Sequence, residues 1–142
     1  MAQAFIDTNV FFASVSARDQ YHDSAHQIVR AIDHGTLPTA VVTNYVVAET
    51  LNLVREKMGP ETATTILDNL VEGMHFEIRH ASESDFTSAQ AVFRRYDELS
   101  FVDATIVAGM RRADTQYLYS FDDDFDAVED ITRLDSAVNP FS

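Results

Sequence analysis

Residues 4–10 read AFIDTNV, and this stretch decides the fold because three apolar residues run directly into a carboxylate. Ala4–Ile6 is short and apolar, which predicts a buried β-strand. Asp7 follows this strand at once, in the turn that leads into the next helix. A strand that passes straight into a helix is the opening unit of an α/β fold.

The remainder of the chain repeats this alternation of short apolar runs and helical periods. Four more strands are predicted, at Thr39–Thr43, His75–Arg79, Tyr117–Ser120 and Ile131–Leu134. Apolar residues at helical spacing separate them, at 22–34, 47–58, 60–73, 82–96 and 100–112. Strands separated by helices require crossovers, and these give a parallel sheet covered on both faces. The sequence therefore predicts an α/β fold, one three-layer α/β/α domain over residues 1–142 with a central parallel sheet.

The helix that begins after Ser82 carries the clearest local signal. Asp85 lies three residues after Ser82, which is the spacing of a capping box. An aromatic-rich stripe at helical spacing is expected to form its buried face, namely Phe86, Ala89, Phe93 and Tyr96.

Composition restricts the class of protein. The 142 residues include no cysteine, which excludes disulfides, thiolate chemistry and zinc–sulfur sites. No stretch approaches the roughly 18 consecutive apolar residues that a membrane helix needs. The N-terminus, MAQAFIDTNVFF, has no basic region of the kind that begins a signal peptide. These features predict a soluble cytoplasmic protein with no membrane contact.

Acidity is the unusual property of the composition. Asp and Glu number 23 against 10 for Lys and Arg, which gives a net charge of −13. This balance argues against a nucleic acid held by a basic surface. It suits the solvated surface of a protein from a halophilic organism with multimolar intracellular salt. In such salt the Debye length is about 3 Å or less, so an RNA substrate remains compatible with the charge.

Four carboxylates occupy positions where a parallel α/β sheet forms its sites. Asp7 and Asp122 follow predicted strands directly, while Glu49 lies in the second turn of one predicted helix and Asp103 in the first turn of another. The carboxyl ends of parallel strands meet at one edge, so a single cleft can gather all four side chains. Crowded carboxylates repel one another unless a cation joins them, and hard oxygen ligands favour Mg²⁺ or Mn²⁺.

Each of these residues also has a purely structural interpretation. Asp7 can cap the helix that follows it, and Asp103 has capping-box spacing from Ser100. Glu49 can be a polar position on an amphipathic helix, and Asp122 belongs to the solvated run DDDFD. Their joint placement, and none of them singly, favours a functional site.

Four segments of the chain resemble PIN-domain ribonucleases of the VapC toxin type. They are FIDTNV at 5–10, TNYVVAETLNLV at 43–54, LSFVDATIVAGMRR at 99–112 and YSFDDDF at 119–125, and they occur in the family's order. The resemblance assigns the family's four acidic positions to Asp7, Glu49, Asp103 and Asp122. It also assigns supporting polar roles to Thr8, Asn9 and Ser120. The triplet 122–124 leaves open whether Asp124 shares or takes the fourth role.

The resemblance implies a metal-dependent endoribonuclease. Carboxylates hold one or two Mg²⁺ or Mn²⁺ ions, which activate a water molecule and stabilise charge on the attacked phosphate. It further implies a homodimer, a small antitoxin partner protein, and products with a 5′-phosphate and a 3′-hydroxyl. Two alternatives remain: an RNA-processing nuclease with no antitoxin, and a PIN-like binding module without catalysis.

Overall fold

The computed structural model describes residues 2–142 and contains one five-stranded sheet in the order β3-β2-β1-β4-β5. Every neighbouring pair of strands is parallel, as predicted. The strand bounds are β1 Gln3–Ile6, β2 Thr39–Thr43, β3 Phe76–Arg79, β4 Tyr117–Tyr119 and β5 Thr132–Leu134.

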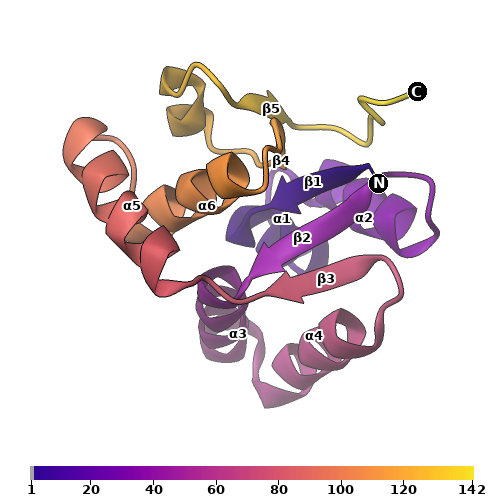
Figure 1. The fold of residues 1–142 in the computed structure, drawn as a ribbon. Helices are drawn as coiled ribbons and strands as arrows, with labels where there is room; N and C mark the ends of the chain where they lie inside the picture. The colour runs from indigo at the N-terminus through magenta and orange to yellow at the C-terminus, as the bar shows by residue number, and fades with distance from the viewer. Residues whose placement is uncertain (1) are drawn as a thin grey trace.

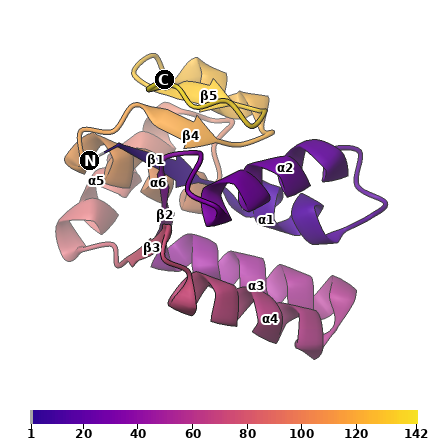
Figure 2. The same ribbon diagram turned by 90° about the vertical axis from the view of Figure 1, so that its right-hand side faces the viewer.

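Helices cover both faces of this sheet, which gives the predicted three layers (Figure 1). Figure 2 shows the strands one above another, with α1 to α4 on the right and α5 on the left, where α6 packs against it. The helix bounds are α1 Thr8–Val15, α2 His22–Asp33, α3 Asn44–Met58, α4 Pro60–Glu72, α5 Glu83–Arg95 and α6 Phe101–Arg112, with a short 3₁₀ helix, η1, at Asp123–Ala127.

The central strand, β1, marks the point where the chain reverses its direction across the sheet. The chain first adds β2 and β3 on one side of β1 and then crosses back to add β4 and β5 on the other. The backbone N–H of Asp7 donates to the carbonyl of Tyr119 at 3.0 Å, so the ends of β1 and β4 are joined. Crevices at such switch points are where α/β sheets bind their ligands.

Two glycines shape the helical layers. Gly59 has a φ of 93°, a conformation that side chains rarely adopt, and it separates α3 from α4. Gly109 lies where α6 crosses β1, and a Cβ there would lie only 3.1 Å from the ring of Phe5. The missing side chain therefore lets α6 pack closely on the central strand, which carries the first turn of α6 toward the switch point.

The predicted buried face of α5 is wrong in part. Phe86 is 42% exposed and Phe93 46% exposed, whereas Ala89 and Val92 are the buried apolar residues. Both phenylalanine rings pack on Phe101 of α6 instead, with ring centroids 5.4 and 5.7 Å apart. A helix with two adjacent apolar stripes can turn either stripe toward its neighbour. Here α5 packs on α6, and the smaller side chains fit the close contact.

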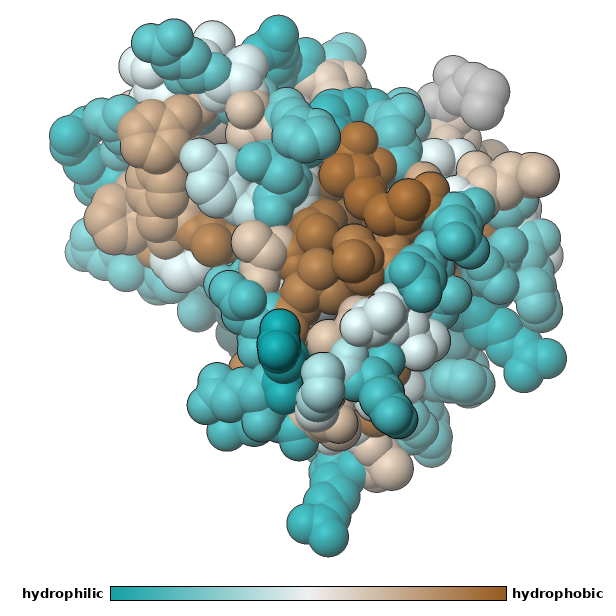
Figure 3. All heavy atoms as spheres, turned by 90° about the horizontal axis from the view of Figure 1, so that it is seen from below, coloured by the Kyte–Doolittle hydropathy of each residue, from teal (hydrophilic) through white to brown (hydrophobic). Residues whose placement is uncertain are grey.

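Hydrophobic side chains also reach the surface on the side formed by α3 and α4. Figure 3 shows them gathered near the middle of this face. Leu67 and Val71 of α4 are among the exposed large hydrophobic residues, and Leu51 of α3 lines a shallow pocket together with Leu67. In the described part of the chain no helix is long and apolar enough to cross a membrane.

Candidate active site

A cleft of about 490 Å³ opens at the switch point of the sheet. Its lining includes all four carboxylates singled out in the sequence, contributed by four separate segments: Asp7, Glu49, Asp103 and Asp122. The expectation that these residues gather at one edge of the sheet is met by this geometry.

Asp7 lies at the base of the cleft, between β1 and α1. It caps α1, because its Oδ1 accepts the backbone N–H of Thr8 at 2.8 Å. Only 4% of the residue is exposed. Burial, and next the negative charge of Asp103, raise the pKa of Asp7 to about 7 from an ordinary value of 3.8. Without a cation nearby, the folded protein therefore resists ionisation of this carboxyl.

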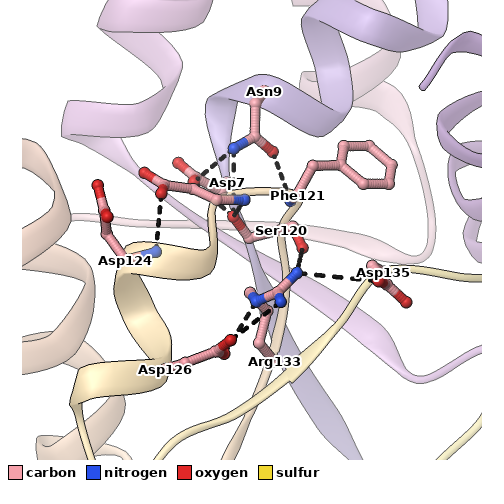
Figure 4. A network of polar contacts seen from close by, with 9 residues as sticks. Asp7, Asn9, Ser120, Phe121, Asp124, Asp126, Arg133 and Asp135 are labelled. Carbon is pink, nitrogen blue, oxygen red and sulfur yellow. Dashed lines mark hydrogen bonds and ion pairs between the residues drawn. The ribbon is translucent and has the colours of Figure 1, made fainter. Parts of the chain in front are cut away.

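Asn9 and Ser120 fix the orientation of Asp7, as Figure 4 shows. The Ser120 hydroxyl donates to Asp7 Oδ2 at 2.9 Å, and the Asn9 amide donates to the same oxygen at 3.1 Å. Asn9 also donates to the Ser120 hydroxyl and accepts the backbone N–H of Phe121. The start of α1 and the end of β4 are thus held together through one carboxylate.

Asp103 both caps a helix and faces the cleft. Its Oδ2 accepts the backbone N–H of Ser100 at 3.0 Å, and the Ser100 hydroxyl accepts the backbone N–H of Asp103 at 3.1 Å. Burial raises the pKa of Asp103, the hydrogen bonds with Ser100 oppose this, and the charges of Asp122 and Glu49 add to the rise. The two interpretations of this residue are therefore compatible, since a carboxylate has a second oxygen.

Glu49 and Thr8 complete the wall nearest α1 and α3. Glu49 lies in the second turn of α3, a helix capped by Thr43, whose hydroxyl accepts the backbone N–H of Val46 at 3.2 Å. Thr8 is 6% exposed and lines the cleft, and its hydroxyl has no hydrogen-bond partner among residues 2–142. A buried orphan oxygen beside a carboxylate cluster is a position where a metal-bound water or a ligand oxygen would find a partner.

The structure separates Asp122 from Asp124. Asp122 lines the cleft, and its backbone N–H donates to the Ser120 hydroxyl at 3.0 Å. Asp124 does not line the cleft; its backbone N–H donates to Asp122 Oδ1 at 3.0 Å and so helps to orient that side chain. Carboxylate oxygens of residues 122, 123 and 124 nevertheless lie within 4.8 Å of one another. Asp122 is therefore the better candidate for the fourth acidic position.

Arg133 stabilises the backbone behind this acidic loop (Figure 4). Its guanidinium binds both oxygens of Asp126, at 3.0 and 3.1 Å, and donates to the carbonyl of Ser120 at 3.3 Å. A bidentate pair of this kind has a defined geometry. The 3₁₀ helix η1 is thereby fastened to the ends of β4 and β5.

Sequence reasoning missed several residues that line the cleft, among them Asp19, Tyr21 and Phe121. Asp19 and Tyr21 lie in the loop between α1 and α2, where no periodicity or spacing marks a residue. Phe121 stands inside the last acidic motif, and its aromatic character was the only available signal. The rings of Tyr21 and Phe121 are stacked, with centroids 4.5 Å apart and planes 3° from parallel.

Chemically, the described residues that line the cleft offer carboxylate, hydroxyl and amide oxygens and no sulfur or imidazole. That set of hard donors suits Mg²⁺ or Mn²⁺. A cation would also relieve the repulsion among Asp7, Asp103 and their acidic neighbours.

Comparison with known proteins agrees with this architecture. The PIN domain family model matches residues 4–131. The chain is 30% identical over 126 residues to the 23S rRNA-specific endonuclease VapC20 of Mycobacterium tuberculosis, covering 87% of this chain and 92% of that protein. It is 34% identical over 105 residues to a VapC ribonuclease of Archaeoglobus fulgidus, covering 71% of this chain and 65% of that protein.

Solved structures extend the comparison to the fold. The crystal structure of M. tuberculosis VapC20, described as a toxin that cleaves the sarcin–ricin loop, superposes with a TM-score of 0.80 at 27% identity, over 96% of this chain and 99% of that chain. A toxin–antitoxin complex from Klebsiella pneumoniae shares the fold at 18% identity, with a TM-score of 0.67 over 96% and 98% of the two chains. Together with the matched family model, these relatives show that the chain belongs to the PIN-domain family and is a homologue of its VapC-type ribonuclease toxins.

Proposed function

We propose that this protein is a Mg²⁺-dependent endoribonuclease, with Mn²⁺ as an alternative ion, and the toxin of a toxin–antitoxin pair. One observation carries the proposal: four carboxylates from four distant segments converge on one cleft at the switch point of the sheet. A structural capping role accounts for Asp7, Asp103 and Asp122, which cap α1, α6 and η1, but it leaves the presence of Glu49 at the same cleft unexplained.

The residues present fit a divalent ion. Asp7 and Asp103 are the proposed direct ligands, and Asp7 is already oriented by Asn9 and Ser120. When bound, the metal lowers the pKa of a coordinated water and stabilises the negative charge that develops on the attacked phosphate. In metal sites, the carboxylates that bind the ion usually accept hydrogen bonds from neighbouring residues, which fix their orientation.

The remaining polar residues have distinct proposed roles. Glu49 and Asp122 bind a second ion, orient the attacking water or accept its proton. The free hydroxyl of Thr8 positions a water molecule or a phosphate oxygen. Hydrolysis by an attacking water leaves a 5′-phosphate and a 3′-hydroxyl on the products, as the family resemblance implies.

The activity is tested with purified protein and RNA, with Mg²⁺, with Mn²⁺ and with chelator. We expect cleavage with either metal, none with chelator, and none by Asp7→Asn protein. Asp68→Asn, on the exposed surface of α4, is the matched control and should cut like the wild type. Cleavage that copurifies with the protein and resists chelator would refute the metal mechanism.

Ribosomal RNA is the first substrate to test, because the relative VapC20 is named for 23S rRNA cleavage. Mapping the new 5′ ends in total RNA after brief expression identifies the target without assuming it. Ends spread without preference over all RNAs would exclude a single ribosomal target.

A small antitoxin is the proposed partner, since one of the structures that share this fold is a toxin–antitoxin complex. An arginine of the partner inserted into the acidic cleft would compensate its charge in place of the metal. Co-purification from the native host tests this, and light scattering of the purified toxin tests the expected homodimer. Recovery from that host of the toxin with no small bound protein would count against the partner.

A further inference from the structure

The acidic cleft has an aromatic side as well as a charged one. Tyr21 and Phe121 both line it, and their rings are stacked nearly parallel at 4.5 Å. Tyr21 is the outer ring of the pair and remains 41% exposed. An exposed aromatic face at the mouth of a cleft is a surface on which a flat ring can stack.

Hydrogen bonds fix the backbone that carries both rings. The backbone N–H of Tyr21 donates to Asp19 Oδ1 at 2.8 Å, and the next residue, His22, places Nδ1 2.7 Å from the carbonyl of Ala13. On the other side, the backbone N–H of Phe121 donates to Asn9 Oδ1 at 3.2 Å. The backbone on both sides of the aromatic pair is therefore held by hydrogen bonds. Because Asn9 also donates to Asp7, the same residue connects the aromatic pair to the carboxylates.

The charge of the cleft explains why such a surface is needed. Among the described residues, its lining contains five carboxylates, those of Asp7, Asp19, Glu49, Asp103 and Asp122, and no lysine, arginine or histidine. RNA-binding proteins commonly gain affinity from cationic contacts to phosphates, and this cleft offers none of its own. Base stacking on an aromatic ring adds affinity without any positive charge on the protein.

We infer that Tyr21, backed by Phe121, stacks on an unpaired base of the RNA next to the scissile phosphate. This inference rests on the proposed ribonuclease function and specifies its substrate: RNA whose nucleotides at the cleavage point are single-stranded or can be turned out of a loop. Tyr21 is then a residue that positions the substrate, while the carboxylates carry the chemistry.

The experiment is a double-substitution cycle between the protein and the RNA. A single-stranded oligonucleotide with one cleavage position is prepared intact and with an abasic site at each neighbouring nucleotide. For the wild type, kcat/KM should fall roughly 5- to 150-fold at one abasic position, mainly through KM, which is the range for losing one stacked base.

Tyr21→Leu should lose a similar factor on intact RNA and should be insensitive to the same abasic site. Tyr21→Phe should behave like the wild type, because it keeps the ring. The control is Phe93→Leu, an aromatic residue of similar exposure on α5 outside the cleft, which should cut intact RNA normally and keep the sensitivity. A Tyr21→Leu protein that remains sensitive to every abasic position would overturn the inference.

A second measurement uses only the wild-type protein, so its result does not depend on whether a variant folds. The wild type is mixed rapidly with RNA carrying 2-aminopurine at the sensitive position, and stacking should quench its fluorescence before product forms. Unchanged fluorescence there overturns the stacking. A wild type that cuts intact and abasic RNA equally well would also overturn the stacking, but it would leave the ribonuclease function standing. A wild type that cuts no RNA would refute the ribonuclease function itself.

Discussion

Ser100 and Asp103 hold each other through two hydrogen bonds, of 3.0 and 3.1 Å, at the first turn of α6. The same pair of distances occurs between Ser82 and Asp85 at the first turn of α5. The two capping boxes are alike in local geometry, yet Asp103 lines the acidic cleft and Asp85 does not. This internal comparison separates what a cap contributes from what a metal ligand contributes.

Asp103→Asn is therefore expected to change metal binding more than folding. Burial and neighbouring carboxylates raise the pKa of Asp103, so removing its charge should leave the chelated protein melting at or above the wild type. The variant should lose the stabilisation given by saturating Mg²⁺, which is about 2.7 kcal/mol at a hundredfold excess over Kd. Thermal melting at one fixed high salt, with chelator and with Mg²⁺, measures both effects.

Asp85→Asn is the control for that measurement. It removes a favourable charge from the first turn of α5, which costs about 0.3–1 kcal/mol, and it also removes the ion pair of Asp85 with Arg112. It should keep the full Mg²⁺ gain. If Asp103→Asn also melts lower in chelator, keeps the Mg²⁺ gain and cuts RNA normally, Asp103 is a cap alone.

The pH dependence of the metal-free protein should report Asp7. The pKa of Asp7 is about 7 in the folded protein against an ordinary 3.8, chiefly because the carboxyl is buried. A raised pKa stabilises the fold at low pH, where both states hold the proton, and this contribution is lost as pH rises toward about 7. Each pH unit in that window costs up to about 1.4 kcal/mol.

Asp7→Asn has no such proton to lose. We measure the free energy of unfolding in chelator from about pH 5 to about pH 8. The value for Asp7→Asn should increase relative to that of the wild type as pH rises. Asp68→Asn serves again as the exposed control. Parallel curves for wild type and Asp7→Asn would show that Asp7 ionises at its ordinary pH.

Asn9→Ala should weaken metal binding without touching a ligand. The substitution removes hydrogen bonds to Asp7, to Ser120 and from the backbone of Phe121. Losing hydrogen bonds that orient a metal ligand typically lowers the metal affinity about 10- to 100-fold. Titration calorimetry with Mn²⁺ measures it, with Asn69→Ala on the exposed surface of α4 as control. An unchanged Mn²⁺ affinity would show that the hydrogen bonds of Asn9 are not needed to orient Asp7.

Salt should stabilise this protein. A net charge of −13 opposes compaction, and screening relieves the repulsion. The melting temperature should rise as KCl increases from tenths of molar to multimolar. A flat or falling curve would remove the interpretation that the acidic surface is an adaptation to salt.

The sequence predicted most of what depends on local pattern. All five strands appear at the expected places, and the carboxylates that follow β1 and β4 lie together because parallel strands share an edge. The orientation of α5 was wrong because the spacing of Phe86 and Phe93 fits a stripe beside the true contact as well as the contact itself.

Loop residues were beyond such prediction for a different reason. Tyr21 and Phe121 are 100 positions apart in the chain and meet only because β1 and β4 are neighbours and Asn9 holds the loop after β4. The choice of Asp122 over Asp124 likewise depends on the direction of one turn. In that turn the backbone N–H of Asp122 donates to the Ser120 hydroxyl, and the backbone N–H of Asp124 donates to Asp122 Oδ1.

The dispersal of the cleft along the chain has a consequence for synthesis. Strand β1 and Asp7 are made first, but β4, which pairs with that strand and is followed by Ser120, is made more than a hundred residues later. A ribosome-bound nascent chain therefore holds an incomplete cleft until residue 122 has emerged. If the chain cuts ribosomal RNA, this delay keeps the translating ribosome out of reach of the enzyme it is producing.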